Sequence, residues 1–267
     1  MRTASRVAGP PKPVGIVPNV RPNEPHDTSP ESSFRPITAV LWDFHGTLAQ
    51  VEPLSRSVEI AADQLGVELP PYRATILADA LGALGWVGSG QPAKVTPSFA
   101  AAWADRDLTE SAHREAFIGL ADQTSGAFDG FAEAMYERLI APDGWVAFRD
   151  TIPTLRALRD AKIPTALISN IGFDLRPVIK HLGFDDLIDH WILSYEVGWC
   201  KPEPEIFREA CLRLEVEPED VLMVGDQPAD AAATALGIRA YLVPHAGPGG
   251  DVGLDAVRQL VGAQRVE

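Results

Sequence analysis

The chain has 267 residues, 46% of them hydrophobic, so it is long and apolar enough for one large domain or two modest ones with a full core. Acidic side chains outnumber basic ones by 37 to 23, which gives a formal net charge of −14. This charge repels nucleic-acid phosphates and anionic lipids, so neither nucleic acid nor a membrane surface is an expected partner. The same charge favours a bound metal cation, which would reverse the sign locally for an anionic substrate.

Cysteine content and hydropathy indicate the compartment. The two cysteines, Cys200 and Cys211, are too few for a disulfide framework and lack metal-binding spacing. No apolar run approaches the ~18 residues that span a bilayer, and the first residues lack the compact apolar segment of a secretory signal. We therefore expect a soluble, cytoplasmic protein.

The chain opens with a proline-rich stretch. Residues 1–36 carry eight of the 23 prolines and few large apolar side chains. Proline restricts the backbone and removes hydrogen-bond donors, and so few apolar groups do not offset the entropy lost on ordering. This composition predicts a disordered arm over residues 1–36.

A short strand then ends at a carboxylate. The apolar, β-prone run over residues 37–42 leads directly to Asp43, and Gly46 permits a sharp turn soon after it. Ligands of open α/β sheets bind just beyond the carboxyl ends of the strands. Asp43 is therefore either a turn-capping residue or a reactive group at a strand tip.

Residues 53–145 have a helical pattern. Apolar residues recur three and four apart, proline or glycine separates the segments, and β-branched runs are absent. The predicted helices are Leu54–Leu65, Tyr72–Leu84, Ser98–Ala104, Leu108–Ala121 and Phe128–Leu139. This region cannot extend the sheet that the first strand begins, so it predicts a helical insertion.

From residue 146 onward, helices alternate with short apolar strands. The predicted helices are Ile152–Asp160, Leu175–Leu182, Pro204–Leu214 and Ala229–Leu236, and the predicted strands are Pro164–Ser169, Trp191–Ser194, Val221–Gly225 and Ala240–Val243. This alternation indicates a parallel sheet covered on both faces. The predicted fold class is α/β, with a Rossmann-like core of residues 37–52 and 146–267 and a helical cap of residues 53–145.

Polar residues suited to phosphate chemistry stand at the ends of these strands or just before a helix. They are Asp43, Ser169 with Asn170, Lys201, and Asp226 with Asp230. Because parallel strands end at one edge of a sheet, we expect these side chains to lie close together. The set suits attack on a phosphoryl group: a carboxylate nucleophile forms an aspartyl intermediate, carboxylates hold Mg²⁺, and a lysine and a hydroxyl bind the phosphoryl oxygens.

With these motifs the chain resembles the haloacid dehalogenase superfamily, in its subgroup with a helical cap inserted after the first motif. The residues that carry the resemblance are Asp43-Phe44-His45-Gly46-Thr47, Ser169, Lys201 and Gly225-Asp226-Gln227-Pro228-Ala229-Asp230. All four motifs occur in the family's order, and the resemblance covers about residues 37–246.

The predicted roles combine this resemblance with the chemistry of the residues. The expected catalytic residues are Asp43 as nucleophile, Lys201, which offsets the crowding of the carboxylates, and His45. The expected Mg²⁺ ligands are Asp43, the carbonyl of His45, Asp226 and Asp230. The expected substrate contacts are Gly46, Thr47, Ser169, Asn170 and Lys201.

His45 departs from the family pattern. Phosphatases of the family carry a second aspartate at this position, which protonates the leaving group and then activates water. Imidazole has an unperturbed pKa of ~6.5, so His45 is a candidate acid/base. Nearby carboxylates and phosphate favour its charged form, whereas a metal ion opposes it. In the alternative interpretation, His45 only fills the loop and the enzyme is weak or inactive.

Three functional hypotheses follow. The first is Mg²⁺-dependent hydrolysis of a small phosphomonoester through an aspartyl-phosphate intermediate, with a phosphorylated small molecule as partner. The second keeps Asp43 as nucleophile but attacks the carbon of a 2-haloacid. The metal-free dehalogenases of the family have an aromatic residue at position 45, and the presence of both Asp226 and Asp230 argues against this hypothesis. In the third, the chain is a binding or regulatory member whose arm recruits a partner; the pattern leaves the oligomeric state open.

The predicted cap is expected to close over the strand ends, exclude water and contact the substrate. Aromatic residues at helical spacing are more often core than ligand contacts. The candidate contact residues are Tyr72, Arg73, Trp86, Trp103, Arg106, His113 and Arg114.

Overall fold

The computed structural model describes residues 35–262. The predicted proline-rich arm lies outside these residues, apart from Arg35 and Pro36. Within the described range, no helix combines the length and the apolar character needed to cross a bilayer.

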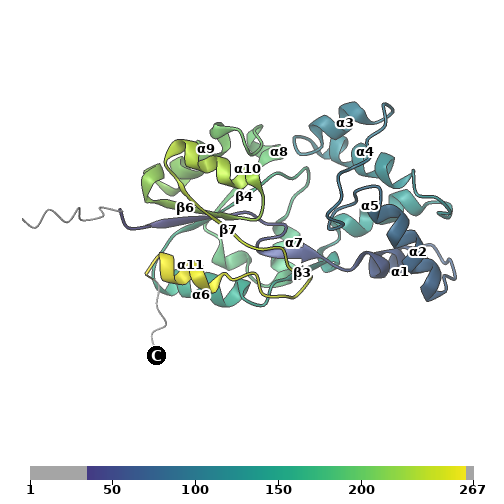
Figure 1. Ribbon diagram of the computed structural model, residues 1–267, viewed down its shortest axis with the longest axis horizontal. Coiled ribbons are helices and arrows are strands. Elements are labelled where there is room, and N and C mark those ends of the chain that lie inside the picture. Colours follow the sequence, from purple (N-terminus) through teal and green to yellow (C-terminus); the bar gives the residue numbers. More distant parts are fainter. Residues whose placement is uncertain (1–34, 263–267) are drawn as a thin grey trace, which may run out of the picture. The chain divides into compact units, whose positions relative to one another are not determined.

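Five parallel strands form the central sheet, in the spatial order β5-β4-β1-β6-β7 (Figure 1). At the end of β1, Trp42 lies opposite Leu167 of β4 on one side and Val224 of β6 on the other. The strands are β1 (Ala39–Trp42), β4 (Thr165–Ser169), β5 (His190–Leu193), β6 (Val221–Gly225) and β7 (Arg239–Leu242). Parallel neighbours require crossover connections, which helices provide here. The predicted α/β fold with a parallel sheet is confirmed.

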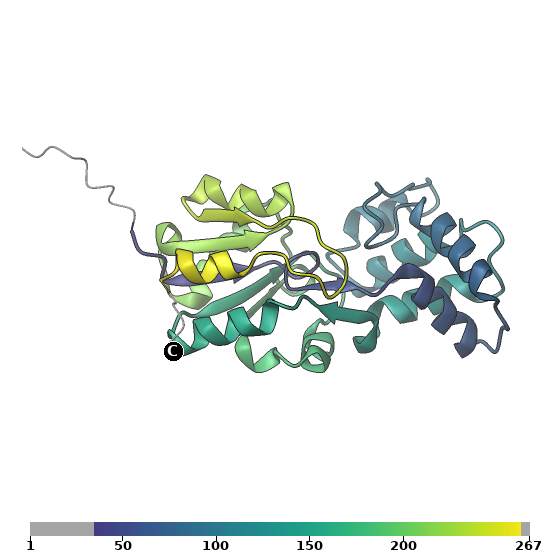
Figure 2. The ribbon, with the colours of Figure 1, turned by 60° about the horizontal axis from the view of Figure 1, so that its bottom comes forward.

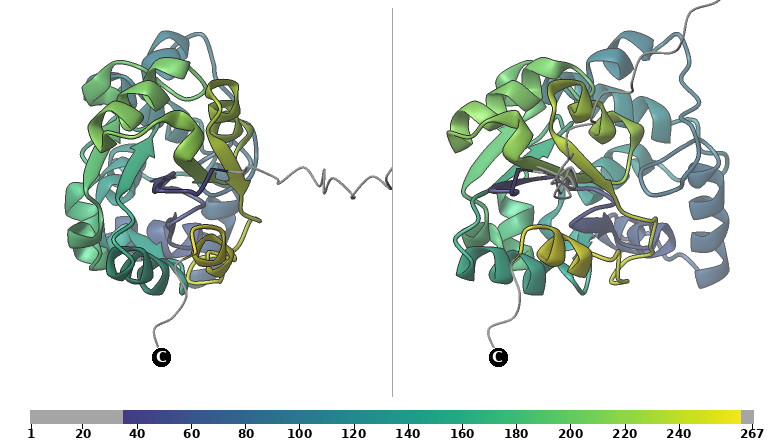
Figure 3. Two further views of the ribbon diagram at one scale, coloured as in Figure 1. Left: turned by 90° about the vertical axis from the view of Figure 1, so that its left-hand side faces the viewer. Right: turned by 60° about the vertical axis from the view of Figure 1, so that its left-hand side comes forward.

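The two faces of the sheet bury different side chains, because successive residues of a strand point to opposite sides. Leu41 packs in one cluster with Phe207 of helix α9 (Pro204–Leu214). Trp42 packs in another cluster with Leu155 of α6 (Thr151–Asp160) and Val257 of α11 (Asp255–Leu260). Figures 1 and 3 show α9 and the yellow helix α11 on opposite sides of the sheet. Every residue of β1, β4 and β6 is buried, as expected for strands covered on both faces.

Short helices cover the sheet and link its strands. They are α6 (Thr151–Asp160), α7 (Arg176–Leu182), α8 (Ser194–Val197), α9 (Pro204–Leu214), α10 (Pro228–Ala231) and α11 (Asp255–Leu260), with 3₁₀ turns η2 (Asp185–Leu187), η3 (Pro218–Asp220) and η4 (Ala232–Leu236). The prediction of one α-helix over residues 229–236 is wrong in its second half, which is the 3₁₀ turn η4. Gly237 ends this segment with a φ of +88°, a conformation that glycine adopts readily.

Five helices lie between β2 and β3, and we call them the inserted helices. They are α1 (Leu54–Gln64), α2 (Pro71–Gly82), α3 (Ala100–Asp105), α4 (Glu110–Ala121) and α5 (Phe131–Ile140). Helix α2 begins with Pro71, and the hydroxyl of Thr109 accepts the N–H of Ala112 at the start of α4. Figure 2 shows the strands of the central sheet pointing toward the inserted helices.

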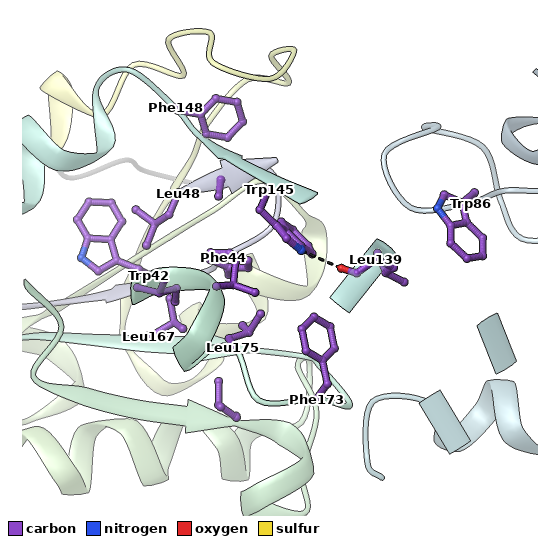
Figure 4. Packing of buried hydrophobic residues seen from close by; sticks show 14 of the residues in the cluster. Trp42, Phe44, Leu48, Trp86, Leu139, Trp145, Phe148, Leu167, Phe173 and Leu175 are labelled. Carbon is purple, nitrogen blue, oxygen red and sulfur yellow. Dashed lines mark hydrogen bonds between the residues drawn. The ribbon is translucent and has the colours of Figure 1, made fainter. Parts of the chain in front are cut away.

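A two-stranded antiparallel sheet, absent from the predicted elements, joins the inserted helices to the rest of the chain. Strand β2 (Ala49–Val51) pairs with β3 (Trp145–Ala147), which follows the 3₁₀ turn η1 (Pro142–Gly144). The ring of Trp145 lies 5.0 Å from that of Phe44, and its Nε1 donates to the carbonyl of Leu139 at 2.9 Å (Figure 4). Both connections to the inserted helices are therefore held together beside the loop that follows β1.

Candidate active site

Polar side chains at the carboxyl ends of β1, β4 and β6 line one cavity of about 310 Å³. Strand β1 pairs in parallel with both β4 and β6, which brings their ends to the same edge of the sheet. The predicted site residues that line this cavity are Asp43, His45, Ser169, Asn170, Lys201, Asp226 and Asp230. Gly46 and Thr47 are next to them, in the loop after β1.

Lys201 connects two carboxylates in this cavity. Its Nζ lies 2.6 Å from Oδ1 of Asp43 and 2.7 Å from Oδ1 of Asp230, and all three side chains are buried. Burial alone would lower the pKa of Lys201, but the two carboxylates raise it above its ordinary value. The lysine therefore stays charged at neutral pH and offsets the repulsion between the two aspartates.

The loop after β1 orients Asp43. The Thr47 hydroxyl donates to Oδ2 of Asp43 at 3.0 Å, so both oxygens of this carboxylate have a partner. Gly46 has a φ of +87°, and a Cβ at this position would collide with the carboxylate of Asp226. Only glycine adopts this φ without strain and also leaves room for the carboxylate. Burial raises the pKa of Asp43, while Lys201 and the Thr47 hydroxyl oppose the rise.

Asn170 fixes the backbone of Lys201. Its Nδ2 donates to the Lys201 carbonyl at 2.8 Å, and its Oδ1 accepts the Lys201 N–H at 2.7 Å. Both polar groups of the side chain are thus used within the protein. Ser169, the last residue of β4, lines the cavity beside it.

Three carboxylates gather at the sheet edge. Asp43, Asp226 and Asp230 each place an oxygen within 4.8 Å of the others. Gln227 donates its side-chain amide to Oδ2 of Asp226 at 2.8 Å, but the buried Oδ1 of Asp226 has no partner among the described residues. Burial raises the pKa of Asp226 and Asp230. Hard oxygen donors with one free buried oxygen fit a divalent cation such as Mg²⁺.

His45 lines the cavity and lies edge-on to Trp145, with ring centroids 5.6 Å apart. Its Nε2 is buried and has no partner within residues 35–262. Burial, and secondarily the nearby His245, lowers the pKa of His45 to about 4. The imidazole is therefore neutral near pH 7 and is a poor proton donor there.

The inserted helices contribute two residues to the cavity, Arg106 and Asp107, from the loop between α3 and α4. Arg106 Nη2 lies 3.2 Å from Oδ2 of Asp107, and its Nη1 donates to the Trp103 carbonyl at 2.7 Å. Arg106 was among the candidate contact residues. Asp107 was not, because nothing in the periodicity of a short loop marks it.

The other candidate contact residues do not line this cavity. Trp86 is buried against Phe117 of α4, and Trp103 packs 5.5 Å from the same ring. His113 is buried between Tyr136 of α5 and Phe173 of the core. The remaining three are Tyr72, Arg73 and Arg114.

Comparison with known proteins agrees with this geometry. A family model described as haloacid dehalogenase-like hydrolase matches residues 37–236. Haloacid dehalogenase-like hydrolase domain-containing protein 3 of Bos taurus is 33% identical over 119 residues, which cover 44% of this chain and 47% of that protein. The alignment thus spans about half the length of this relative. A plasmid phosphoglycolate phosphatase of Cupriavidus necator is 29% identical over 230 residues, 83% of this chain and 87% of the relative.

Solved structures show the same architecture. The crystal structure of a HAD phosphatase from Thermococcus onnurineus is 26% identical in sequence and superposes with a TM-score of 0.53, covering 86% of this chain and 100% of the other. The family match over residues 37–236 includes the parallel strands β1, β4, β5 and β6 and the four ordered motifs. The chain therefore belongs to the haloacid dehalogenase-like hydrolase family.

Proposed function

We propose that this protein is a Mg²⁺-dependent hydrolase that cleaves a small phosphomonoester through an aspartyl-phosphate intermediate on Asp43. The observation that carries the proposal is the Lys201 ammonium, which lies within hydrogen-bond distance of both Asp43 and Asp230 beside a third carboxylate. This arrangement combines an oriented nucleophile, a cation for the phosphoryl oxygens and ligands for a metal ion.

The donor set fits Mg²⁺. Asp43, Asp226, Asp230 and the carbonyl of His45 would hold the ion, and the free oxygen of Asp226 supports this assignment. When bound, Mg²⁺ neutralises the charge of the phosphoryl group as the nucleophile approaches.

The residues of the chain carry the remaining chemistry. An oxygen of Asp43 forms a bond to phosphorus while the bond to the ester oxygen breaks. Lys201 and the Ser169 hydroxyl bind phosphoryl oxygens. Water then attacks phosphorus and releases Asp43, and the neutral imidazole of His45 accepts the proton of this water.

The size of the cavity and the relatives support a small substrate. A volume of about 310 Å³ accommodates a compact molecule, and one relative is named phosphoglycolate phosphatase. We assign the inserted helices to a cap domain, residues 53–145, over a core of residues 37–52 and 146–267, because their α3–α4 loop lines the cavity. Both cysteines are free thiols, which suits the reducing cytoplasm.

Phosphate release from a panel of small phosphomonoesters, measured with Mg²⁺ and with EDTA, tests the proposal. We expect release only with the metal, and a loss on the order of 10³-fold or more for Asp43→Asn. Asp63→Asn, at an exposed position on α1, is the matched control and is expected to retain full activity. Hydrolysis by Asp43→Asn at the parent rate would overturn the proposal.

Attack of Asp43 on carbon is a second candidate reaction. It is favoured by one observation: the loop after β1 carries a buried, neutral histidine where phosphatases of the family carry an aspartate. Halide release from a 2-haloacid that persists in EDTA would establish this reaction, whereas phosphate release that EDTA abolishes would exclude it as the main activity.

A further inference from the structure

The cavity contains one carboxylate that the proposed function leaves without a role. Four aspartates line it, and three of them form the cluster at the sheet edge. The fourth, Asp107, comes from the loop between α3 and α4. We propose that Asp107 is the general acid that protonates the leaving group, a task that the residue at position 45 performs in phosphatases of the family. This assignment rests on the proposed function.

Within residues 35–262, the main groups on the sheet side of the cavity already have another contact or an assigned role. Lys201 is held between two carboxylates at 2.6 and 2.7 Å, and Asp43 is the nucleophile. His45 is assigned to the second step, in which it accepts the proton of the attacking water. The departing alkoxide is therefore left without an assigned proton donor on this side.

The carboxyl group of Asp107 is held in an orientation that leaves one oxygen available. Its side chain is 18% exposed, and Oδ2 lies 3.2 Å from Nη2 of Arg106. Among the described residues, no hydrogen bond to Oδ1 is found. One oxygen is thus oriented by the arginine, while the other is left for a substrate oxygen.

The backbone of this loop is fixed to the core at two points. The Ser194 hydroxyl donates to the carbonyl of Asp107, and the same hydroxyl accepts the N–H of Ile171 at 2.8 Å. Gly172 lies so close to the carbonyl of Arg106 that a Cβ there would collide with it. The segment that contacts this loop directly follows Ser169 and Asn170, so Asp107 is positioned relative to the phosphoryl-binding end of β4.

The surroundings of Asp107 favour its protonated form. Burial raises its pKa, and the opposing charges that face it are Arg106 on its own loop and Lys201 from the core. Cys200 is a further titratable neighbour, and the charge of Asp107 contributes to raising the pKa of its thiol.

The proposed step balances without a further reactant. As the Asp43 oxygen bonds to phosphorus and the bond to the ester oxygen breaks, the Asp107 carboxyl transfers its proton to that oxygen, and a neutral alcohol departs. Asp107 is left as a carboxylate and regains a proton from solvent after the alcohol leaves. General acid catalysis of this kind typically contributes about 10²- to 10⁴-fold to the rate.

Comparison of two esters tests the assignment. p-Nitrophenyl phosphate releases a stabilised phenolate that needs no proton, whereas an alkyl phosphate such as phosphoglycolate releases an alkoxide that does. The ratio kcat/KM covers the steps through departure of the leaving group and excludes hydrolysis of the aspartyl phosphate. For Asp107→Asn we expect kcat/KM to fall about 10²- to 10⁴-fold on the alkyl ester and less than about 3-fold on the aryl ester.

Two variants accompany this measurement. Asp105→Asn changes an exposed aspartate two residues away and is expected to leave both ratios unchanged. Asp107→Glu keeps the acid and is expected to recover part of the activity on the alkyl ester, which also excludes a folding defect. The fall in kcat/KM at high pH, where a general acid loses its proton, is expected in the parent and absent in Asp107→Asn.

The outcomes separate this assignment from the proposed function. Equal losses on both esters, or no loss on either, would overturn the role of Asp107 alone. If the parent releases phosphate from neither ester, the proposed function is overturned, and with it the assignment of Asp107.

Discussion

The two sides of the cavity are built in different ways. On the sheet side, Asp43 and its partners stand at the ends of buried strands and are cross-linked by hydrogen bonds of 2.6 to 3.0 Å. On the other side, the loop of Arg106 and Asp107 is docked through the Ser194 hydroxyl and a close approach to Gly172. The junction with the inserted helices includes two strands of three residues each. In the proposed reaction, the steps common to all substrates take place at the hydrogen-bonded sheet edge, and the contact with the leaving group comes from a less extensively anchored loop.

Lys201→Met tests the sheet side and is expected to have the largest effect. Without the ammonium, Asp43 and Asp230 are buried with no opposing charge, which lowers the free energy of unfolding by about 3–5 kcal/mol. Phosphate release is expected to fall by at least about 10²-fold. Urea unfolding and the phosphate assay measure the two effects, and Lys180→Met, at an exposed position on α7, is the control.

The pH dependence of this variant identifies the cause. Burial raises the pKa of both carboxyl groups, and the lysine opposes that rise in the parent. In the variant, the two carboxyl groups take up protons at a higher pH in the folded protein than in the unfolded chain. The loss of unfolding free energy relative to the parent therefore becomes smaller as the pH falls from about 7.5 to about 4.5. A deficit of equal size at both pH values would contradict the ion-pair explanation.

The sheet side was largely predictable from the sequence. Apolar runs alternating with helical segments determine a parallel sheet, and three of these runs end at Asp43, Ser169 and Asp226, so their convergence follows from topology. The partners within the site were not predictable. Thr47 and Asn170, expected as substrate contacts, bind the Asp43 carboxylate and the Lys201 backbone.

For the inserted region, the sequence predicted the helices but neither the strands beside them nor the position of Asp107 in the cavity. Strands of three residues are too short to show a period, so the β2–β3 pair gave no signal. Asp107 lies in a short loop, and its place in the cavity depends on the Ser194 hydroxyl, 87 residues away in sequence. Sequence periodicity carries no information about such tertiary contacts.

Arg138→Met tests the junction between the two regions. Arg138 of α5 donates through Nε and Nη2 to the two oxygens of Glu52, just after β2, at 2.7 and 2.9 Å, and both side chains are 4% exposed. Removing the arginine leaves a buried carboxylate, and we expect a loss of about 3 kcal/mol in urea unfolding. The double variant Glu52→Leu/Arg138→Met is expected to recover much of this loss. Arg208→Met, which breaks an exposed pair with Glu205, should cost less than about 1 kcal/mol.

His113 makes the stability of the inserted helices depend on pH. It is buried on α4, with Nδ1 3.2 Å from the Tyr136 hydroxyl, and burial, with a smaller contribution from Arg106, lowers its pKa to about 4. In the unfolded chain, His113 has a pKa of about 6.5, so between pH 6.5 and 4 the unfolded state binds more protons than the folded state. Up to about 3 kcal/mol of the unfolding free energy present above pH 6.5 is therefore lost as the pH falls through this range.

His113→Phe is expected to flatten the dependence of the unfolding free energy on pH across this window. Part of the slope should remain, because the pKa of His45 is lowered in the same way. His181→Gln, at an exposed position on α7, is the control and should keep the parent slope. A slope in His113→Phe as steep as that of the parent would show that this histidine does not titrate with unfolding.

Gly172→Ala tests whether the docked loop acts separately from the sheet edge. Its Cβ would collide with the carbonyl of Arg106 and with the His113 side chain, so we expect a loss of about 1–3 kcal/mol and a displaced loop. Gly247→Ala is the matched control, since a Cβ there meets nothing within 4 Å. If only the loop moves, kcat/KM falls more on an alkyl phosphate than on p-nitrophenyl phosphate, because Asp107 shifts while Asp43 and Lys201 stay in place. An equal fall on both esters would mean that the displacement reaches the nucleophile, and the two sides of the cavity would then behave as one unit.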